Sequence, residues 1–291
     1  MVSLFIAIRD GILTWSGFQD VFSGLDALGL KSLELAISKK KEDPAETRPL
    51  SALGVELSRE GIEDLKETFK RKGISVCAIL LDNDFSKEDL NGEVKYVTEA
   101  CAIAQELGVK VVRINAVMKE IPGASLLDYH RLTVKGIKAC LRKAEDLGIS
   151  LAVENHGIIA NKFGFLIRLF KVIGSELFGL TLDTGNFYWF GYPLEEIYDI
   201  VYGLAPFVKH THIKNGRVPA DRRDRKRKPR DMNMTPLYEG DIDMKIVVET
   251  LKDAGYDHDL TIEDESLGNF PVEDRKAILV KDVDYMRKLL P

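Results

Sequence analysis

Short runs rich in Val, Ile, Leu and Thr alternate with longer amphipathic stretches along the whole chain of 291 residues. Such runs predict strands, and the amphipathic stretches between them predict helices. A helix between successive strands is the usual connection of parallel strands, because their ends must be joined across the sheet. We expect eight strands, at residues 4–8, 32–37, 74–81, 110–115, 150–156, 178–183, 208–214 and 260–265.

Eight strand–helix units without a Pro-, Gly- or Ser-rich linker predict one α/β domain over residues 1–291, a closed (β/α)8 barrel of the TIM type. Two of the expected helices, at 93–107 and 127–147, are followed by Gly108 and Gly148, which suit helix C-termini. A doubly wound open sheet is the alternative. It is disfavoured because RDGI, not a G-x-G-x-x-G turn, follows the first strand.

Composition excludes several classes of protein. With 45% hydrophobic residues, 30% charged residues and a net charge of −5, the chain is neither disordered nor fibrous. It has no uncharged apolar run of about 18 residues, and its N-terminus lacks the features of a signal peptide. The odd number of cysteines, Cys77, Cys101 and Cys140, fits buried free thiols in a reducing compartment. We therefore expect a cytoplasmic protein without membrane partners.

The strands show apolar residues on one face and polar residues on the other. In the fifth strand Leu151 and Val153 point to one face, and Glu154 and His156 point to the other. In the sixth strand Leu182 points to one face, and Thr181 and Asp183 point to the other. Because the apolar face must meet the covering helices, the polar face must point into the barrel. Burying several ionised groups there is costly unless a cation, a polar ligand or their mutual pairing compensates.

Four of these polar residues stand at the C-terminal ends of consecutive strands, where active sites of such barrels lie: Glu154, Asp183, His212 and Glu263. Three carboxylates and one imidazole suit a divalent ion, for which we expect Mn²⁺, with Mg²⁺, Co²⁺ or Zn²⁺ as alternatives. The alternative without a metal is a salt-bridged network that uses Arg113 and Lys214.

The motifs around these residues are LAVENHG, LDTGN, KHTHIKN and TIEDES, with YEGDID before the last of them. In order and spacing they resemble the sugar phosphate isomerase/epimerase superfamily of xylose isomerase-like TIM barrels. The resemblance implies that Glu154, Asp183, His212 and Glu263 are metal ligands and that the two glutamates also transfer protons. His212 is preferred over His210 because HIKN resembles the ligand turn of the family. His210 would then orient its neighbour or the substrate.

These residue types suit proton abstraction next to a carbonyl through a metal-stabilised enediolate. We expect a metal-dependent isomerase or epimerase of a sugar or sugar phosphate in carbohydrate metabolism. A lyase, an inosose- or dehydroshikimate-type dehydratase, is the alternative with the same ligands. Minor alternatives are an apurinic endonuclease, which would need more histidines, and a non-catalytic sugar-binding protein. Asn186 stands where several 3-epimerases of the family carry histidine, which speaks against that activity.

Further polar residues share the inward face or the same rim and are candidates for contact with a carbohydrate. Arg113 and Lys214 could anchor substrate oxygens or only balance charge, and His156 could bind substrate or support the site. The candidate substrate-binding residues are His156, Arg113, Lys214, Arg217, Glu34, Asn186 and His210.

A basic segment, RVPADRRDRKRKPR at 217–230, follows the seventh strand within an expected loop insertion at 215–240. Its eight basic and two acidic residues give a local charge of 8 − 2 = +6. It is interpreted as a solvated loop or subunit contact, as a lid over an anionic substrate with Arg217 nearest the metal, or as a nucleic-acid contact. Nucleic acid is not the partner we expect, because aromatic residues are absent from the segment. A homo-oligomer is compatible with the sequence.

Overall fold

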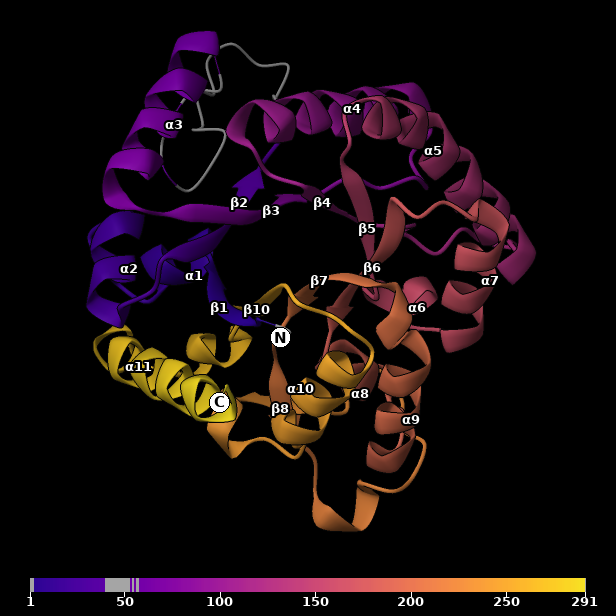
Figure 1. The fold of residues 1–291 in the computed structure, drawn as a ribbon. Coiled ribbons are helices and arrows are strands. Elements are labelled where there is room, and N and C mark those ends of the chain that lie inside the picture. The colour runs from indigo at the N-terminus through magenta and orange to yellow at the C-terminus, as the bar shows by residue number, and fades with distance from the viewer. Residues whose placement is uncertain (1–2, 40–52, 54, 56–57, 291) are drawn as a thin grey trace.

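The computed structural model describes residues 3–39, 53, 55 and 58–290. Its centre is a ring of eight parallel strands with helices on the outside, and the chain passes once around the ring from N- to C-terminus (Figure 1). All eight strands expected from the sequence are present. The strands are β1 (Phe5–Arg9), β2 (Ser32–Ile37), β3 (Ser75–Leu81), β4 (Val111–Ile114), β5 (Ser150–Glu154), β6 (Phe178–Asp183), β7 (Val208–His212) and β10 (Asp259–Ile262).

The ring is closed between β7 and β10. Neighbouring strands pair in the order β10-β1-β2-β3-β4-β5-β6-β7. A parallel bridge between Ile213 and Ile262 joins the two ends, with Ile213 N donating to Thr261 O (2.7 Å) and Glu263 N donating to Ile213 O (3.1 Å). The predicted single TIM barrel is therefore confirmed, and the open-sheet alternative is excluded.

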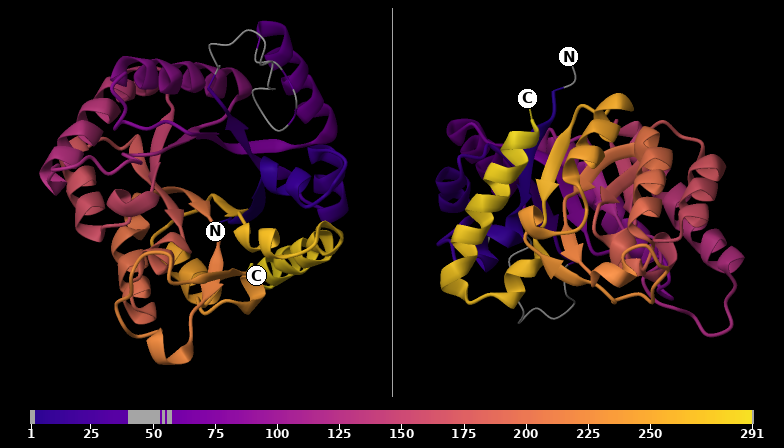
Figure 2. Two further views of the ribbon diagram at one scale, coloured as in Figure 1. Left: turned by 180° about the vertical axis from the view of Figure 1, so that it is seen from behind. Right: turned by 90° about the horizontal axis from the view of Figure 1, so that it is seen from below.

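Helices cover the outside of the barrel, and both termini lie at one end of it (Figure 2). The segment between β7 and α10 also contains a small antiparallel hairpin, β8 (Asn215–Arg217) with β9 (Asn233–Thr235). None of the helices in the described ranges is both long and apolar enough to span a membrane. The α-helices are α1 (Asp10–Trp15), α2 (Val21–Leu28), α3 (Arg59–Lys72), α4 (Leu90–Leu107), α5 (Leu126–Asp146), α6 (Gly157–Ala160), α7 (Phe163–Ile173), α8 (Asn186–Phe190), α9 (Leu194–Leu204), α10 (Met244–Asp253) and α11 (Val272–Leu289), and the 3-10 helices are η1 (Ala205–Phe207), η2 (Ala220–Arg222), η3 (Leu237–Glu239) and η4 (Glu265–Asn269).

The helix ends follow the local sequence. The side chain of Ser125 accepts from the N–H of Asp128, and the Asp128 side chain accepts from Ser125 N, which forms a capping box at the start of α5. The glycines expected after α4 and α5, Gly108 and Gly148, have φ values of 74° and 64°. Because other residues rarely adopt this left-handed conformation, these glycines stop both helices and start the turn toward the next strand.

The strands have an apolar core on each of their two faces, as the alternation of residues predicts. The larger lies between strands and helices and contains Leu33, Leu35 and Val153. The smaller one, inside the barrel, is built from Ala7, Cys77, Ala78, Val111 and Ala152. Because these inner side chains are small, polar side chains from other strands can share the interior. The three cysteines are free and buried, as expected.

Two buried carboxyl groups lie close together beside the barrel: Asp282 on helix α11 and Asp264, which follows Glu263. Asp282 is fully buried and accepts from Leu237 N (2.7 Å), and burial together with Asp264 raises the pKa of Asp282 to about 10. This raised pKa means that Asp282 favours folding below the unfolded pKa of about 3.9 and that this contribution is lost as the pH rises toward 10.

We therefore expect Asp282→Asn, which keeps an acceptor for Leu237, to stabilise the protein at pH 8 by about 1–3 kcal/mol. The gain should disappear near and below pH 4, because the carboxyl of the unfolded chain is then protonated as well and folding no longer has to take up a proton. Thermal unfolding at both pH values measures it. Asp284→Asn, on an exposed part of the same helix, is the matched control. A lower unfolding temperature of Asp282→Asn at pH 8 would contradict the expectation.

Candidate metal centre

Four strand ends bring together the side chains that the sequence predicts as ligands. Glu154 ends β5, Asp183 ends β6, His212 ends β7, and Glu263 follows β10. All four are buried, and one ligand atom from each lies within 4.8 Å of the others. His212 Nδ1 is 3.0 Å from Glu263 Oε2 and 3.4 Å from Glu154 Oε1. The backbone therefore collects three carboxylates and one imidazole in a single cluster.

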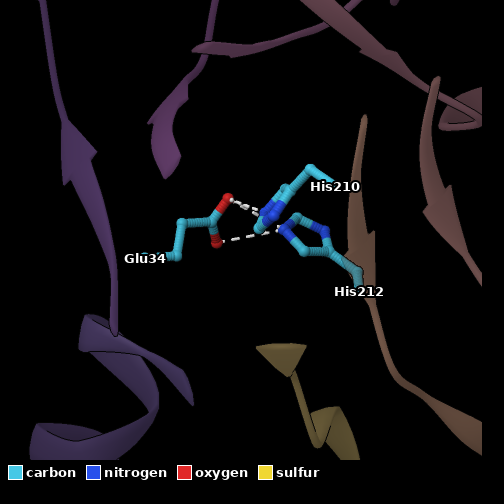
Figure 3. Close-up of side chains that lie close together, drawn as sticks. All are labelled: Glu34, His210 and His212. Carbon is cyan, nitrogen blue, oxygen red and sulfur yellow. Dashed lines mark hydrogen bonds and ion pairs between the residues drawn. The ribbon is translucent and has the colours of Figure 1, made fainter. Parts of the chain in front are cut away.

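His212 is held by a carboxylate behind it. Its Nε2 lies 3.0 Å from both carboxylate oxygens of Glu34, which also accepts from His210 Nε2 (2.8 Å; Figure 3). Burial alone would raise the pKa of Glu34, but His212 and His210 lower it to about 2. The ionised carboxylate can only accept, so Nε2 of His212 carries a hydrogen and Nδ1 is the ring nitrogen that faces Glu154 and Glu263.

One atom of each clustered residue lacks a hydrogen-bond partner among the described residues: Glu154 Oε2, Asp183 Oδ2, His212 Nδ1 and Glu263 Oε2. All three oxygen atoms nevertheless lie within ion-pair distance of a cation, Glu154 Oε2 near Arg113 and both Asp183 Oδ2 and Glu263 Oε2 near Lys214. Three carboxylates that converge in a buried site must be compensated by positive charge. A bound divalent cation would add to that compensation, and the donor set of three oxygens and one nitrogen fits it.

Two neighbouring clusters also have the composition of metal sites. One contains Glu34, His210 and His212, and the other contains Cys77, His210 and Asp259. In both, the polar atoms that face one another are hydrogen-bonded, for example His210 Nδ1 to Asp259 Oδ1 at 2.9 Å. His212 Nδ1 faces the cluster of Glu154, Asp183 and Glu263. Apart from that atom, no side-chain atom of these two neighbouring clusters lacks a hydrogen-bond partner. We therefore interpret them as hydrogen-bonded support.

Three fixed cations surround the ligand cluster. Arg113 pairs with Glu154, and Arg9 pairs with Glu263. Lys214 Nζ lies 3.0 Å from both Asp183 Oδ2 and Glu263 Oε2. Burial would raise the pKa of Glu263, but His212 and Lys214 lower it well below its usual range. Glu263 is thus kept ionised, whereas burial raises the pKa of Asp183 despite its contact with Lys214.

The salt-bridged network anticipated as an alternative therefore exists, and it is larger than Arg113 and Lys214 alone. Arg9 is not among the residues predicted from the sequence, although it continues the inward face of β1 after Ala7 by alternation. Asp259, at the start of β10, is a second buried functional candidate that sequence reasoning missed. It precedes the polar end of its strand and has no distinguishing motif.

Two predicted substrate-binding residues border the cluster. Asn186 donates from Nδ2 to Glu154 Oε1 (3.2 Å) and from its backbone N to Asp183 Oδ1 (2.8 Å). The side chain of His156 is 42% exposed, and its Nδ1 lies 3.1 Å from Asn115 Oδ1. Partial burial of the ring and the nearby charges of Arg113 and Lys214 lower the pKa of His156 to about 3. It is therefore a neutral hydrogen-bonding group.

Glu34 and His210 are fully buried, and Glu34 contacts both His210 and His212, so they lie behind the predicted ligand His212 and not on the exposed side of the site. Arg217 lies in β8, where it contacts Glu239 and Asp241. Within the described ranges it forms no ion pair with the ligand cluster. Its predicted contact with substrate stays a prediction.

The basic segment 217–230 is docked on the aromatic helix α8. Arg227 donates to Tyr192 O (2.7 Å) and covers the Tyr188 ring at 4.3 Å, and Arg230 N donates to Trp189 O (2.8 Å). Arg223 pairs with the buried Asp241 at 2.6 Å. Several of the arginines thus hold the segment in place. Fewer of its positively charged side chains are therefore free to contact a partner molecule.

The pKa of His212 leads to a testable pH dependence of metal binding. Burial alone would lower this pKa, but Glu263 and Glu34 raise it to about 9, so Nδ1 is protonated at neutral pH without metal. A metal must displace that proton. The affinity for Mn²⁺ should therefore rise about tenfold per pH unit from pH 6 to pH 8 and level off near pH 9. Titration of free Mn²⁺ by electron paramagnetic resonance measures it, and a constant affinity would contradict it.

Known proteins resemble this chain over most of its length. An uncharacterized protein of Methanocaldococcus jannaschii, MJ1311, is 27% identical over 225 residues, which are 72% of this chain and 71% of that protein. The crystal structure of IolI protein with a bound zinc atom superimposes with a TM-score of 0.72 at 17% identity, covering 99% of both chains. L-ribulose 3-epimerase gives 0.68 at 18% identity over 98% of this chain and 94% of that one. At these sequence identities, the two solved structures show that this chain shares their fold and nothing more.

A family model described as xylose isomerase-like TIM barrel matches residues 23–289. Eight parallel strands in a closed ring agree with that description. The chain therefore belongs to the xylose isomerase-like TIM barrel family.

Proposed function

We propose that the protein is a divalent-metal-dependent isomerase or epimerase of a sugar or sugar phosphate. The observation that carries the proposal is the convergence, within 4.8 Å of one another, of four buried ligand atoms from Glu154, Asp183, His212 and Glu263. We infer Mn²⁺ as the ion from the oxygen-rich donor set, with Mg²⁺, Co²⁺ and Zn²⁺ as alternatives. Membership in the xylose isomerase-like family is consistent with this chemistry.

A divalent ion in this cluster would polarise a substrate carbonyl and stabilise the negative charge of an enediolate. Glu154 and Glu263 come from strands separated by β6 and β7, so they approach the centre from different sides. Arg113 pairs with Glu154 and Arg9 pairs with Glu263, and the pKa of Glu263 lies well below its usual range because of His212 and Lys214. Either carboxylate can accept the proton next to the carbonyl. Return of a proton to the other face of the same carbon gives epimerisation, and return to the neighbouring carbon gives isomerisation.

Other side chains can position the substrate. The side chain of His156 is 42% exposed, and its Nδ1 lies 3.1 Å from Asn115 Oδ1 and 3.3 Å from Arg113 Nη2. The neutral ring can form a hydrogen bond with a hydroxyl group through Nε2. Lys214, which contacts Asp183, Glu263 and the half-exposed Glu265, can donate to a substrate oxygen. A polyol with adjacent oxygen atoms is the substrate class that this lining suits.

Hydrogen exchange provides the direct test. Mn²⁺-loaded protein is incubated in deuterated water with ketoses, inososes, sugar acids and their phosphates, and the products are analysed by NMR and mass spectrometry. Deuterium next to the carbonyl, with a new epimer or aldose, is the expected result. Loss of one water would instead support the dehydratase. Binding of sugars without any exchange, by a protein that holds no metal, would contradict the proposal and favour a sugar-binding protein.

A further inference from the structure

A continuous chain of hydrogen bonds extends from the ligand cluster to the opposite end of the barrel. Glu34 contacts His212 Nε2 at 3.0 Å and His210 Nε2 at 2.8 Å. On its other side, His210 Nδ1 lies 2.9 Å from Asp259 Oδ1. Asp259 is the first residue of β10, whereas Glu263 follows the end of the same strand. The chain therefore connects a ligand to the N-terminal end of the parallel barrel.

Every interior member of this chain is fully buried, namely Glu34, His210, His212 and Asp259. Both ring nitrogens of His210 face carboxylate oxygens, which accept hydrogen bonds, so the ring is fixed in orientation at both edges. A rotation of this ring would remove one of the two donors that hold Glu34. Because Glu34 fixes the hydrogen of His212 on Nε2, such a rotation would also disturb the ligand atom Nδ1.

Asp259 is itself anchored independently of His210. Its Oδ2 accepts from Thr261 Oγ1 (2.6 Å), and its Oδ1 accepts from Tyr256 OH (3.1 Å). His258 Nδ1 lies 2.8 Å from the same Oδ1, and the His258 side chain is 35% exposed. Because several donors hold the Asp259 carboxylate in place, it is a fixed hydrogen-bond acceptor for the His210 ring.

We propose that Asp259 is a positioning residue for the metal centre, acting through His210 and Glu34 on the ligand His212. This inference rests on the proposed metal site and assigns a function to a residue on the far side of the barrel. Asp259 does not touch substrate or metal. Its effect is to set the orientation of His212 and hence the affinity and geometry of the bound ion.

The test is the affinity of the full-length protein for Mn²⁺ and the visible absorption spectrum of its Co²⁺ form. Partners behind a metal-binding histidine typically change metal affinity by about 10- to 100-fold. We expect Asp259→Asn to weaken binding about tenfold and to alter the Co²⁺ bands, and Glu34→Gln to weaken it more. Asp257→Asn, which makes the same chemical change at an exposed position two residues away, should retain both properties.

A double-mutant cycle separates positioning from general destabilisation. If Asp259 acts through Glu34, Asp259→Asn should cause little further loss of affinity in a Glu34→Gln background. Additive losses, or an Asp259→Asn variant with wild-type affinity and spectrum, would overturn the proposal. If Asp259→Asn does not fold, His210→Gln takes its place in the cycle with the same expectation. Wild-type protein that binds metal but exchanges no substrate proton would instead contradict the proposed function alone.

Discussion

Asp183→Asn should reduce the affinity of the protein for Mn²⁺ by at least about 100-fold, more than the loss of a residue behind a ligand. Oδ1 of Asp183 accepts from the backbone N–H groups of Gly185 and Asn186, at 2.9 and 2.8 Å. The amide oxygen of asparagine can keep both bonds. Its NH₂ group would replace Oδ2, the unsatisfied atom that faces the cluster, and an NH₂ group cannot coordinate a cation.

Isothermal titration with Mn²⁺ and with Zn²⁺ measures this loss. Asp199→Asn on α9 makes the same chemical change at an exposed position and should bind as the wild type does. Circular dichroism would establish that both variants are folded. Equal Mn²⁺ affinity of the wild type and Asp183→Asn would mean that Lys214 and the two arginines satisfy the carboxylates and that the cluster is a salt-bridged network.

The sequence predicted the barrel because each strand carries its own signal. Strand positions agree with the structure to within a few residues, since apolar runs flanked by helix signals have little other interpretation. The convergence of Glu154, Asp183, His212 and Glu263 also follows from the fold. Parallel strands place their C-terminal ends at one rim, so residues far apart in the sequence must meet there.

Pairing within the barrel could not be predicted in the same way. The guanidinium of Arg9 reaches Glu263, and that of Arg113 reaches Glu154, through long side chains whose direction depends on neighbours. Register shifts also interrupt the ladders, at Leu33/Glu34 among other places, and the sequence does not reveal them. Counting only Arg113 and Lys214 as cations overstates the electrostatic need for a metal. The convergence of four potential ligand atoms within 4.8 Å of one another is the firmer support.

Glu154→Gln and Glu263→Gln should each lower the rate of proton exchange by about 10²- to 10⁴-fold, the usual contribution of a general acid or base. A neutral amide can neither accept the proton next to the carbonyl nor return it. Both residues are also proposed ligands, so the variants will bind metal more weakly. The informative measurement is therefore the exchange rate at saturating Mn²⁺ with the substrate that the wild type labels.

Two roles of each glutamate can be separated by that measurement. If Glu154 and Glu263 transfer protons, exchange should stay low after metal occupancy has been restored. Recovery of the wild-type rate at high Mn²⁺ would reduce them to ligands and assign proton transfer to another group, such as His156 or Lys214. Glu249→Gln, on the exposed face of α10, should leave the rate unchanged. A difference between the two variants in isomer and epimer products would identify the face on which each carboxylate acts.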